Sequence, residues 1–145
     1  YQEFSKYGIK FLLNQVTNVK RDQHNLCLIG TDDYWAGAPR LPVASSKGKN
    51  ETRIIASHNP DFFSDLLQNC SHEFDLGLAG HTHGGQIRLP LVGVTSYNIR
   101  DRRFGEGLVS SGSSYVYTSR GIGVVDIPMR INCPPEASIL TLKRA

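Results

Sequence analysis

Leu78-Ala79-Gly80-His81-Thr82-His83-Gly84-Gly85-Gln86 places two histidines one residue apart at the end of an apolar run. Residues 74–79 have the length and composition of a buried strand, so we expect that strand to end in this glycine-rich loop. If the backbone stays extended, both imidazoles point to the same side. If it turns, the glycines allow close approach of the chain to a ligand. Either geometry suits a metal site, and a polar turn that happens to carry histidine is the simpler alternative.

A strand and a capped helix precede this run. Residues 53–57 predict a strand with His58 at its carboxyl end, and Asn59-Pro60 is typical of a helix start. The apolar face of that helix is predicted to carry Phe62, Phe63, Leu66, Leu67 and Cys70. Strand, helix and strand make a β-α-β unit, whose parallel strands end at one edge of the sheet. We therefore expect the three histidines His58, His81 and His83 to converge there.

The remaining chain predicts more strands and loops. Strands are expected at residues 8–14, 16–20, 26–30, 114–119 and 137–142, with a hairpin turn at 21–25 and a short strand or edge piece at 87–92. Residues 32–50 are expected to be irregular or to form a short helix, and residues 95–107 are expected to be a polar loop. The sequence thus predicts a strand-rich α/β fold with one well-marked helix.

Size and composition describe an ordinary globular chain. The 145 residues suffice for one domain, with 39% hydrophobic and 20% charged residues. There is no run of about 18 apolar residues, so no membrane span is expected. The net charge of +3 favours anionic ligands in general and is no strong signal for nucleic acid. Cys27, Cys70 and Cys133 lack a Cys-x-x-Cys spacing, which predicts free thiols rather than a cysteine zinc site.

The motifs resemble those of the calcineurin-like metallophosphoesterases, in particular the bacterial YkuE/YaeI type. The likeness rests on Ser57-His58-Asn59-Pro60-Asp61-Phe62 and on Gly80-His81-Thr82-His83-Gly84-Gly85-Gln86-Ile87-Arg88-Leu89-Pro90. It continues through residues 30–37, 119–123 and 130–136. The resemblance implies half of the family's four-layer α/β/β/α sandwich. Residues 1–145 would be the carboxyl-terminal part of a single metallophosphoesterase domain whose amino-terminal part is absent, as the start at Tyr1 also suggests.

The resemblance also implies a ligand set for two divalent metal ions, Mn, Zn or Fe. His58 and His81 would bind the second ion, and His83 the first. The family's carboxylate-bearing blocks have no match here. Asp22-Gln23-His24 has the Asp-x-His form, but no companion block follows it, so we assign it no metal role. Asp32 and Asp33 lack the required spacing and are expected to be loop residues.

The implied function is metal-dependent hydrolysis of a phosphomonoester, phosphodiester or pyrophosphate bond. Gly84 and Gly85 would let the backbone approach the phosphate, and Arg120 is a candidate phosphate contact, with Arg88 a poorer one. Solvated surface arginines are the simpler reading of both. Because the ligand set is incomplete, we expect this chain alone to be inactive. A non-catalytic metal- or partner-binding module, or an inactive remnant, is the alternative.

Partners and location follow only from the resemblance and from the half-domain expectation. The family branch implies a phosphate-ester or pyrophosphate substrate, phospholipid-like or nucleotide-sugar in some members. It also implies a cytoplasmic location or association with the bacterial membrane or envelope through a missing amino-terminal segment. A half-domain should expose apolar surface where the missing part would pack, so we expect dimerisation or aggregation of the chain alone.

Overall fold

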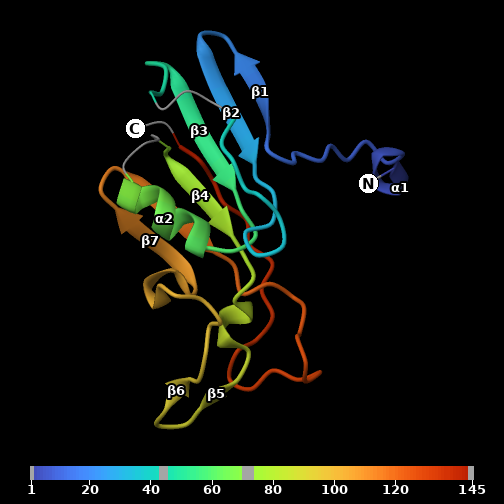
Figure 1. The fold of residues 1–145 in the computed structure, drawn as a ribbon, viewed down its shortest axis with the longest axis vertical. Helices are drawn as coiled ribbons and strands as arrows, with labels where there is room; N and C mark the ends of the chain where they lie inside the picture. The colour runs from blue at the N-terminus through green and yellow to red at the C-terminus, as the bar shows by residue number, and fades with distance from the viewer. Residues whose placement is uncertain (1, 43–45, 70–73, 144–145) are drawn as a thin grey trace.

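A computed structural model describes residues 2–42, 46–69 and 74–143. Six strands of the described chain form a mixed sheet in the order β1-β2-β3-β4-β8-β7 (Figure 1). They are β1 Gln15–Arg21, β2 His24–Gly30, β3 Glu51–Ala56, β4 Leu76–Ala79, β7 Gly107–Ser111 and β8 Ser114–Thr118. The four inner strands are parallel, and β1 and β7 pair antiparallel at the edges. A separate ribbon joins β5 Arg88–Leu89 to β6 Gly93–Val94.

The helix α2, Asp61–Asn69, begins where the sequence predicts. The Asn59 side chain accepts a hydrogen bond from the Asp61 backbone N–H at 2.8 Å, which caps the first turn. Phe62, Phe63 and Leu66 are buried as predicted, while Cys70 lies outside the described residues. The short helix α1, Gln2–Ser5, and the 3-10 turns η1, His83–Gly85, and η2, Arg102–Phe104, complete the helical elements of the described ranges.

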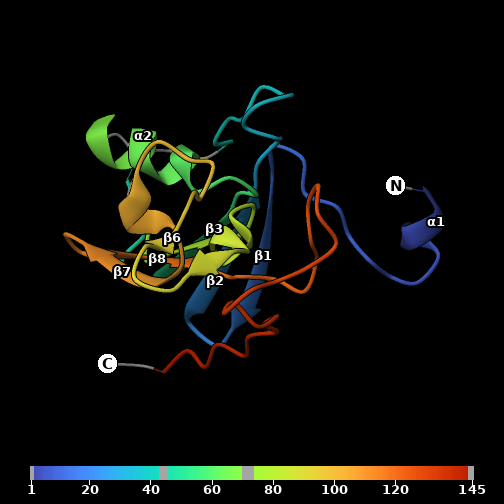
Figure 2. The same cartoon turned by 90° about the horizontal axis from the view of Figure 1, so that it is seen from below.

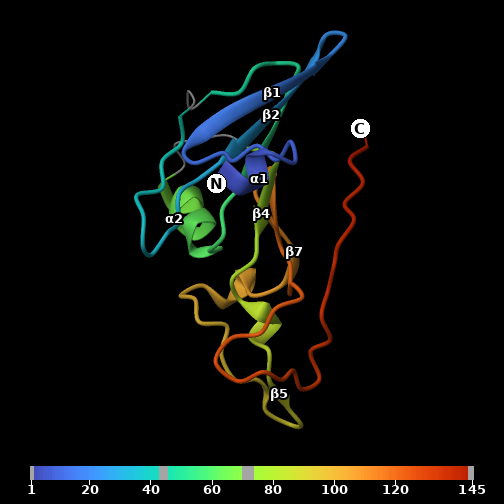
Figure 3. The same ribbon diagram turned by 90° about the vertical axis from the view of Figure 1, so that its right-hand side faces the viewer.

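The core lies between α2 and one face of the sheet (Figures 2 and 3). One row of side chains in register across the strands consists of Val16, Ile29, Ile55, Gly77, Val116 and Val109. Phe63 of α2 is fully buried above Gly77, where an added Cβ would lie 2.6 Å from the ring carbon Cε1. Glycine at this position therefore lets the helix approach the sheet closely.

The opposite side of the sheet, which we call the open face, has no such cover among the described residues. Register places Val19 of β1, Leu108 of β7 and Tyr115 of β8 on this side, and they are 54%, 61% and 49% exposed. The C-terminal stretch, residues 136–143, runs along this side (Figures 2 and 3). It contacts the sheet where the Tyr117 hydroxyl donates to Glu136 at 2.5 Å.

Most of the predicted elements are confirmed. The strands expected at 16–20, 26–30, 53–57 and 114–119 are present, with a hairpin turn at residues 22–23, and the strand expected over 74–79 is β4. The fold class is confirmed as a strand-rich α/β fold with a mixed sheet, consistent with half of a metallophosphoesterase sandwich. Cys27 and Cys133 are buried free thiols. No helix in the described ranges is long and apolar enough to cross a membrane.

Two expected strands are wrong, and two strands were missed. Residues 8–14 and 137–142 form no strand, because an apolar run becomes a strand only where another strand supplies hydrogen-bond partners. Leu12 instead lies against Gly30, where an added Cβ would collide with its backbone. The missed strands are β6, which pairs with β5, and β7, which pairs with β8 at the edge of the sheet.

Candidate metal centre

The structure holds His58 and His81 side by side at the carboxyl ends of β3 and β4. The hydrogen-bond ladder continues past both strands, from Ser57 N–H to the Leu78 carbonyl at 3.0 Å and from Gly80 N–H to the His58 carbonyl at 3.0 Å. The two imidazole centroids are 5.2 Å apart and the rings are nearly perpendicular, at 86°. Parallel pairing of the strands therefore brings together two of the three predicted ligands.

The backbone turns sharply between this pair and His83. His81, His83 and Gly84 have φ values of 67°, 51° and 61°, so the backbone is left-handed here rather than extended. This conformation is unfavourable for the two histidines, and such strain concentrates at functional sites. Nδ1 of His83 lies 3.1 Å from the Gly123 carbonyl. In the described ranges, no three His, Cys, Asp or Glu side chains are close enough to hold one metal ion. The expected convergence is thus seen for His58 and His81 alone.

His81 is packed between an aromatic side chain and a backbone carbonyl. The Trp35 ring meets the His81 ring edge-on, with centroids 4.4 Å apart, and Nε2 of His81 lies 3.4 Å from the Asn98 carbonyl. Desolvation by burial lowers the pKa of His81. The lowered pKa favours the neutral imidazole, which is the form that binds metal ions.

Trp35 comes from the loop after β2, which sequence analysis left irregular. The Asp33 carboxylate accepts hydrogen bonds from the backbone N–H groups of Ala36 at 2.7 Å and Trp35 at 2.8 Å. These bonds lower the pKa of Asp33. The resulting tight turn presents the half-exposed indole to His81. Nothing in the local sequence pattern signals this contact, because it joins the loops after β2 and β4, which are distant in the sequence and separated by β3 in the sheet.

Several buried polar atoms at the same edge of the sheet have no hydrogen-bond partner. They are Thr31 Oγ1 after β2, Ser57 Oγ after β3, Asn59 Nδ2 and Thr118 Oγ1 at the end of β8. Buried polar groups without a partner are costly, so this edge is suited to additional polar ligands. An open hollow of about 530 Å³ borders His58, Ser57 and Thr31. The imidazoles and hydroxyls fit part of a divalent-metal site, and the carboxylates that such a site needs are not among them.

The predicted phosphate contacts are occupied by other groups. The Arg120 guanidinium forms an ion pair with Glu136 at 2.7 Å, and its side chain packs over Gly84, where a Cβ would lie 2.5 Å from Arg120 Cγ. Arg88 forms an ion pair with Glu106 at 2.5 Å. Both arginines are therefore paired rather than freely solvated. Gly84 and the adjacent Gly85 are buried in this packing. Substrate contacts from Gly84, Gly85 and Arg120 stay predictions.

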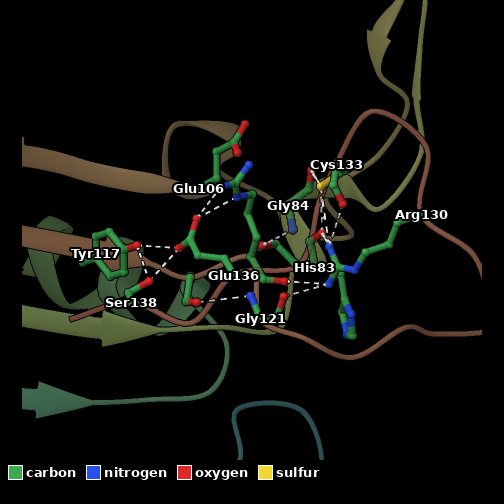
Figure 4. Close-up of polar contacts among 12 residues, drawn as sticks. His83, Gly84, Glu106, Tyr117, Gly121, Arg130, Cys133, Glu136 and Ser138 are labelled. Carbon is green, nitrogen blue, oxygen red and sulfur yellow. Dashed lines mark hydrogen bonds and ion pairs between the residues drawn. The ribbon is translucent and has the colours of Figure 1, made fainter. Parts of the chain in front are cut away.

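The Glu136 carboxylate joins this ion pair to the C-terminal stretch (Figure 4). It accepts hydrogen bonds from the Tyr117 hydroxyl at 2.5 Å and from the Ser138 hydroxyl at 2.7 Å. Hydrogen bonding from Tyr117, then Ser138 and Arg120, lowers the pKa of Glu136 to about 2. By contrast, Asp22 and His24 lie at the β1–β2 turn, at the other end of β2 from the histidine pair.

Comparison with known proteins identifies the family. Phosphodiesterase YaeI of Escherichia coli strain K12 is 40% identical over 135 residues, which cover 93% of this chain and 48% of YaeI. The uncharacterized metallophosphoesterase YkuE of Bacillus subtilis is 32% identical over 84% of this chain and 42% of its own length. This chain is related to the metallophosphoesterases. The resemblance to the YkuE/YaeI type is confirmed, and the chain spans about half the length of these curated relatives.

A further relative, from Danio rerio, is named a transmembrane protein with metallophosphoesterase domain. It is 32% identical over 95% of this chain and 33% of its own length. No protein-family model matches the chain, and no solved structure matches it.

Proposed function

We propose that this chain is the histidine-bearing part of a metal-dependent phosphoesterase, in which His58, His81 and His83 hold divalent ions. The observation that carries the proposal is the His58–His81 pair, with ring centroids 5.2 Å apart at the ends of adjacent parallel strands. Bound ions would supply an activated water and neutralise charge on the phosphate. The protein groups would fix where those ions lie, because both histidines follow within two residues of the ends of adjacent sheet strands.

The division of the histidines supports two ions rather than one. His58 and His81 have their rings in contact and would share an ion, whereas His83 contacts the Gly123 carbonyl and would serve the other ion. The carboxylate ligands would come from outside residues 1–145, which would form the carboxyl-terminal part of a single domain. The open face supports this arrangement, because its exposed apolar side chains offer a surface for the rest of that domain.

The substrate class is proposed from a relative's name. YaeI is named a phosphodiesterase, so we propose a phosphodiester for this chain, with phosphomonoesters and pyrophosphates as further substrates to be assayed. The ions would be Mn, Zn or Fe, all of which imidazole binds well. The zebrafish relative's name motivates one more proposal, attachment to a membrane through a segment outside residues 1–145. Without its missing ligands, the chain alone would be inactive.

The test replaces each histidine with alanine in the full encoded protein. We expect His58→Ala, His81→Ala and His83→Ala each to weaken metal binding, and hydrolysis of bis(p-nitrophenyl) phosphate, by at least about 100-fold. Groups that merely support a metal ligand already contribute about 10–100-fold. His24→Ala is the matched control, because that exposed histidine lies at the opposite end of β2.

The outcomes separate the competing functions. Full metal content and full turnover in all three variants would refute the proposal. Histidine-dependent metal binding without turnover of any phosphate ester would instead favour the non-catalytic module. Turnover by residues 1–145 alone would contradict the proposed origin of the carboxylates.

A further inference from the structure

The Arg130 side chain forms hydrogen bonds with His83, with residues 120–123 and with Cys133 (Figure 4). Its guanidinium donates hydrogen bonds to the backbone carbonyls of Gly123 at 2.6 Å, Arg120 at 2.8 Å, His83 at 2.9 Å, Gly121 at 3.2 Å and Cys133 at 3.4 Å. Nε also donates to the Gly123 carbonyl, at 3.1 Å. The planar fork of an arginine can serve several acceptors at once, which a single ammonium cannot do with the same geometry.

The Gly123 carbonyl is shared between Arg130 and His83. Nδ1 of His83 lies 3.1 Å from this oxygen. A carbonyl oxygen can only accept a hydrogen bond, so Nδ1 must carry the proton. In the neutral ring, Nε2 then has the free lone pair, which is the state required of a metal ligand.

In the part of the chain that the structure describes, no backbone N–H donates a hydrogen bond to the Gly123 carbonyl. Residues 119–130 contain no helix or strand, and Gly123 is exposed. Regular secondary structure therefore does not orient its carbonyl. Two hydrogen bonds from Arg130 orient the Gly123 carbonyl. A third hydrogen bond, from Arg130 to the His83 carbonyl, anchors the backbone of His83 to the same guanidinium. The buried Cys133 also contacts the His83 backbone, with Sγ 3.4 Å from the His83 carbonyl oxygen.

We propose that Arg130 is a positioning residue for His83: through the Gly123 carbonyl it selects the Nδ1–H tautomer and frees Nε2 for a metal ion. The inference rests on the proposed function, because it assumes that His83 is a metal ligand. It extends that function to a residue 47 positions downstream that touches no ion itself.

The experiment reads the tautomer directly, without metal or substrate. The full encoded protein is labelled with ¹⁵N-histidine, and long-range ¹H–¹⁵N spectra are recorded at about pH 8, where an ordinary histidine is neutral. His83→Gln assigns the signal. We expect the Nδ1–H tautomer of His83 in the unsubstituted protein and a tautomer mixture in Arg130→Lys and Arg130→Ala. Zn²⁺ affinity, measured by calorimetry, should fall by about 10–100-fold in these variants.

A matched control makes the same substitution at another arginine. Arg103 in η2 is exposed and forms an ion pair with Asp101, away from His83. Arg103→Lys should leave both the tautomer and Zn²⁺ affinity unchanged. The near-ultraviolet circular dichroism of every variant shows whether it has folded.

The inference and the proposed function can fail separately. A proton on Nε2 of His83 in the unsubstituted protein would overturn the inference, whether or not the Arg130 variants fold. A folded Arg130→Lys protein with unchanged tautomer and Zn²⁺ affinity would overturn it too. If His83→Gln leaves Zn²⁺ affinity unchanged, the proposed ligand role fails, even where the tautomer still depends on Arg130.

Discussion

On the α2 face of the sheet, Ile29, Ile55 and Val116 are almost completely buried beneath a helix, whereas on the open face Ile54 is buried but Leu108 and Tyr115 are 61% and 49% exposed. Both faces carry apolar side chains. The difference is the cover: among the described residues, α2 lies over one side and an irregular C-terminal stretch runs along the other (Figure 3). The comparison indicates that residues 1–145 complete one layer of core, while the open face is suited to a partner surface.

The largest expected effect tests the packing of the α2 face. Phe63→Ala removes a fully buried ring between α2 and Gly77, so we expect the free energy of unfolding of residues 1–145 to fall by about 3–5 kcal/mol. Urea denaturation followed by circular dichroism measures this loss. Leu108→Ala in residues 1–145 alone is the matched open-face change, and it should cost less than about 0.5 kcal/mol. Equal losses at the two positions would remove the contrast between the faces.

The next prediction concerns association through the open face. We expect residues 1–145 alone to self-associate, because exposed apolar patches mark interaction surfaces. The double substitution Val19→Lys and Leu108→Lys places charge on this face and should shift the chain towards monomer in sedimentation velocity, with little change in stability. An unsubstituted chain that is monomeric and unfolds cooperatively would contradict the half-domain proposal.

The smallest expected effect is the pH dependence of the contact between the C-terminal stretch and the open face. Glu136 has a pKa of about 2 in the folded chain against an ordinary value of 4.5. A lowered pKa of an acid stabilises the fold above the ordinary pKa, and this stabilisation is lost as the pH falls from about 4.5 to 2. Glu136→Gln should therefore lower stability by less than about 1 kcal/mol at neutral pH, because solvent screens this partly exposed group.

Denaturation of the full encoded protein across this pH range measures the effect. The stability curves of Glu136→Gln and the unsubstituted protein should converge as the pH falls below about 2, because the Glu136 carboxyl is then mostly protonated. A constant difference between the curves across the range would show that the carboxylate charge is not what stabilises this contact.

The elements that sequence analysis predicted correctly carry local signals. The helix α2 has a capping asparagine, a proline and apolar residues at helical spacing, and β2 and β3 are short apolar runs of strand length. Residues 137–142 have an equally strand-like composition but no partner strand in the described chain, so their pattern was misleading. Strand formation depends on a neighbour that may be distant in sequence, and a local pattern does not report that neighbour.

The candidate site likewise combines features that local sequence signals predict with features that they do not. The adjacency of His58 and His81 follows from the β-α-β connection, because parallel strands end at one edge of the sheet. The separation of His83 depends on left-handed backbone angles that the glycines permit but do not require. Trp35 and Arg130 were not predicted as site residues, since each reaches its histidine from a loop distant in the sequence.

The sequence by itself determined the β-α-β unit, the helix start and the place of the histidines at strand ends, because spacing and residue type control these features locally. The tertiary structure alone decided which imidazoles face each other, that Arg120 and Arg88 are paired with carboxylates, and that one carbonyl joins Arg130 to His83. These features are contacts between remote segments. Their geometry is set by packing and hydrogen bonding across the whole fold.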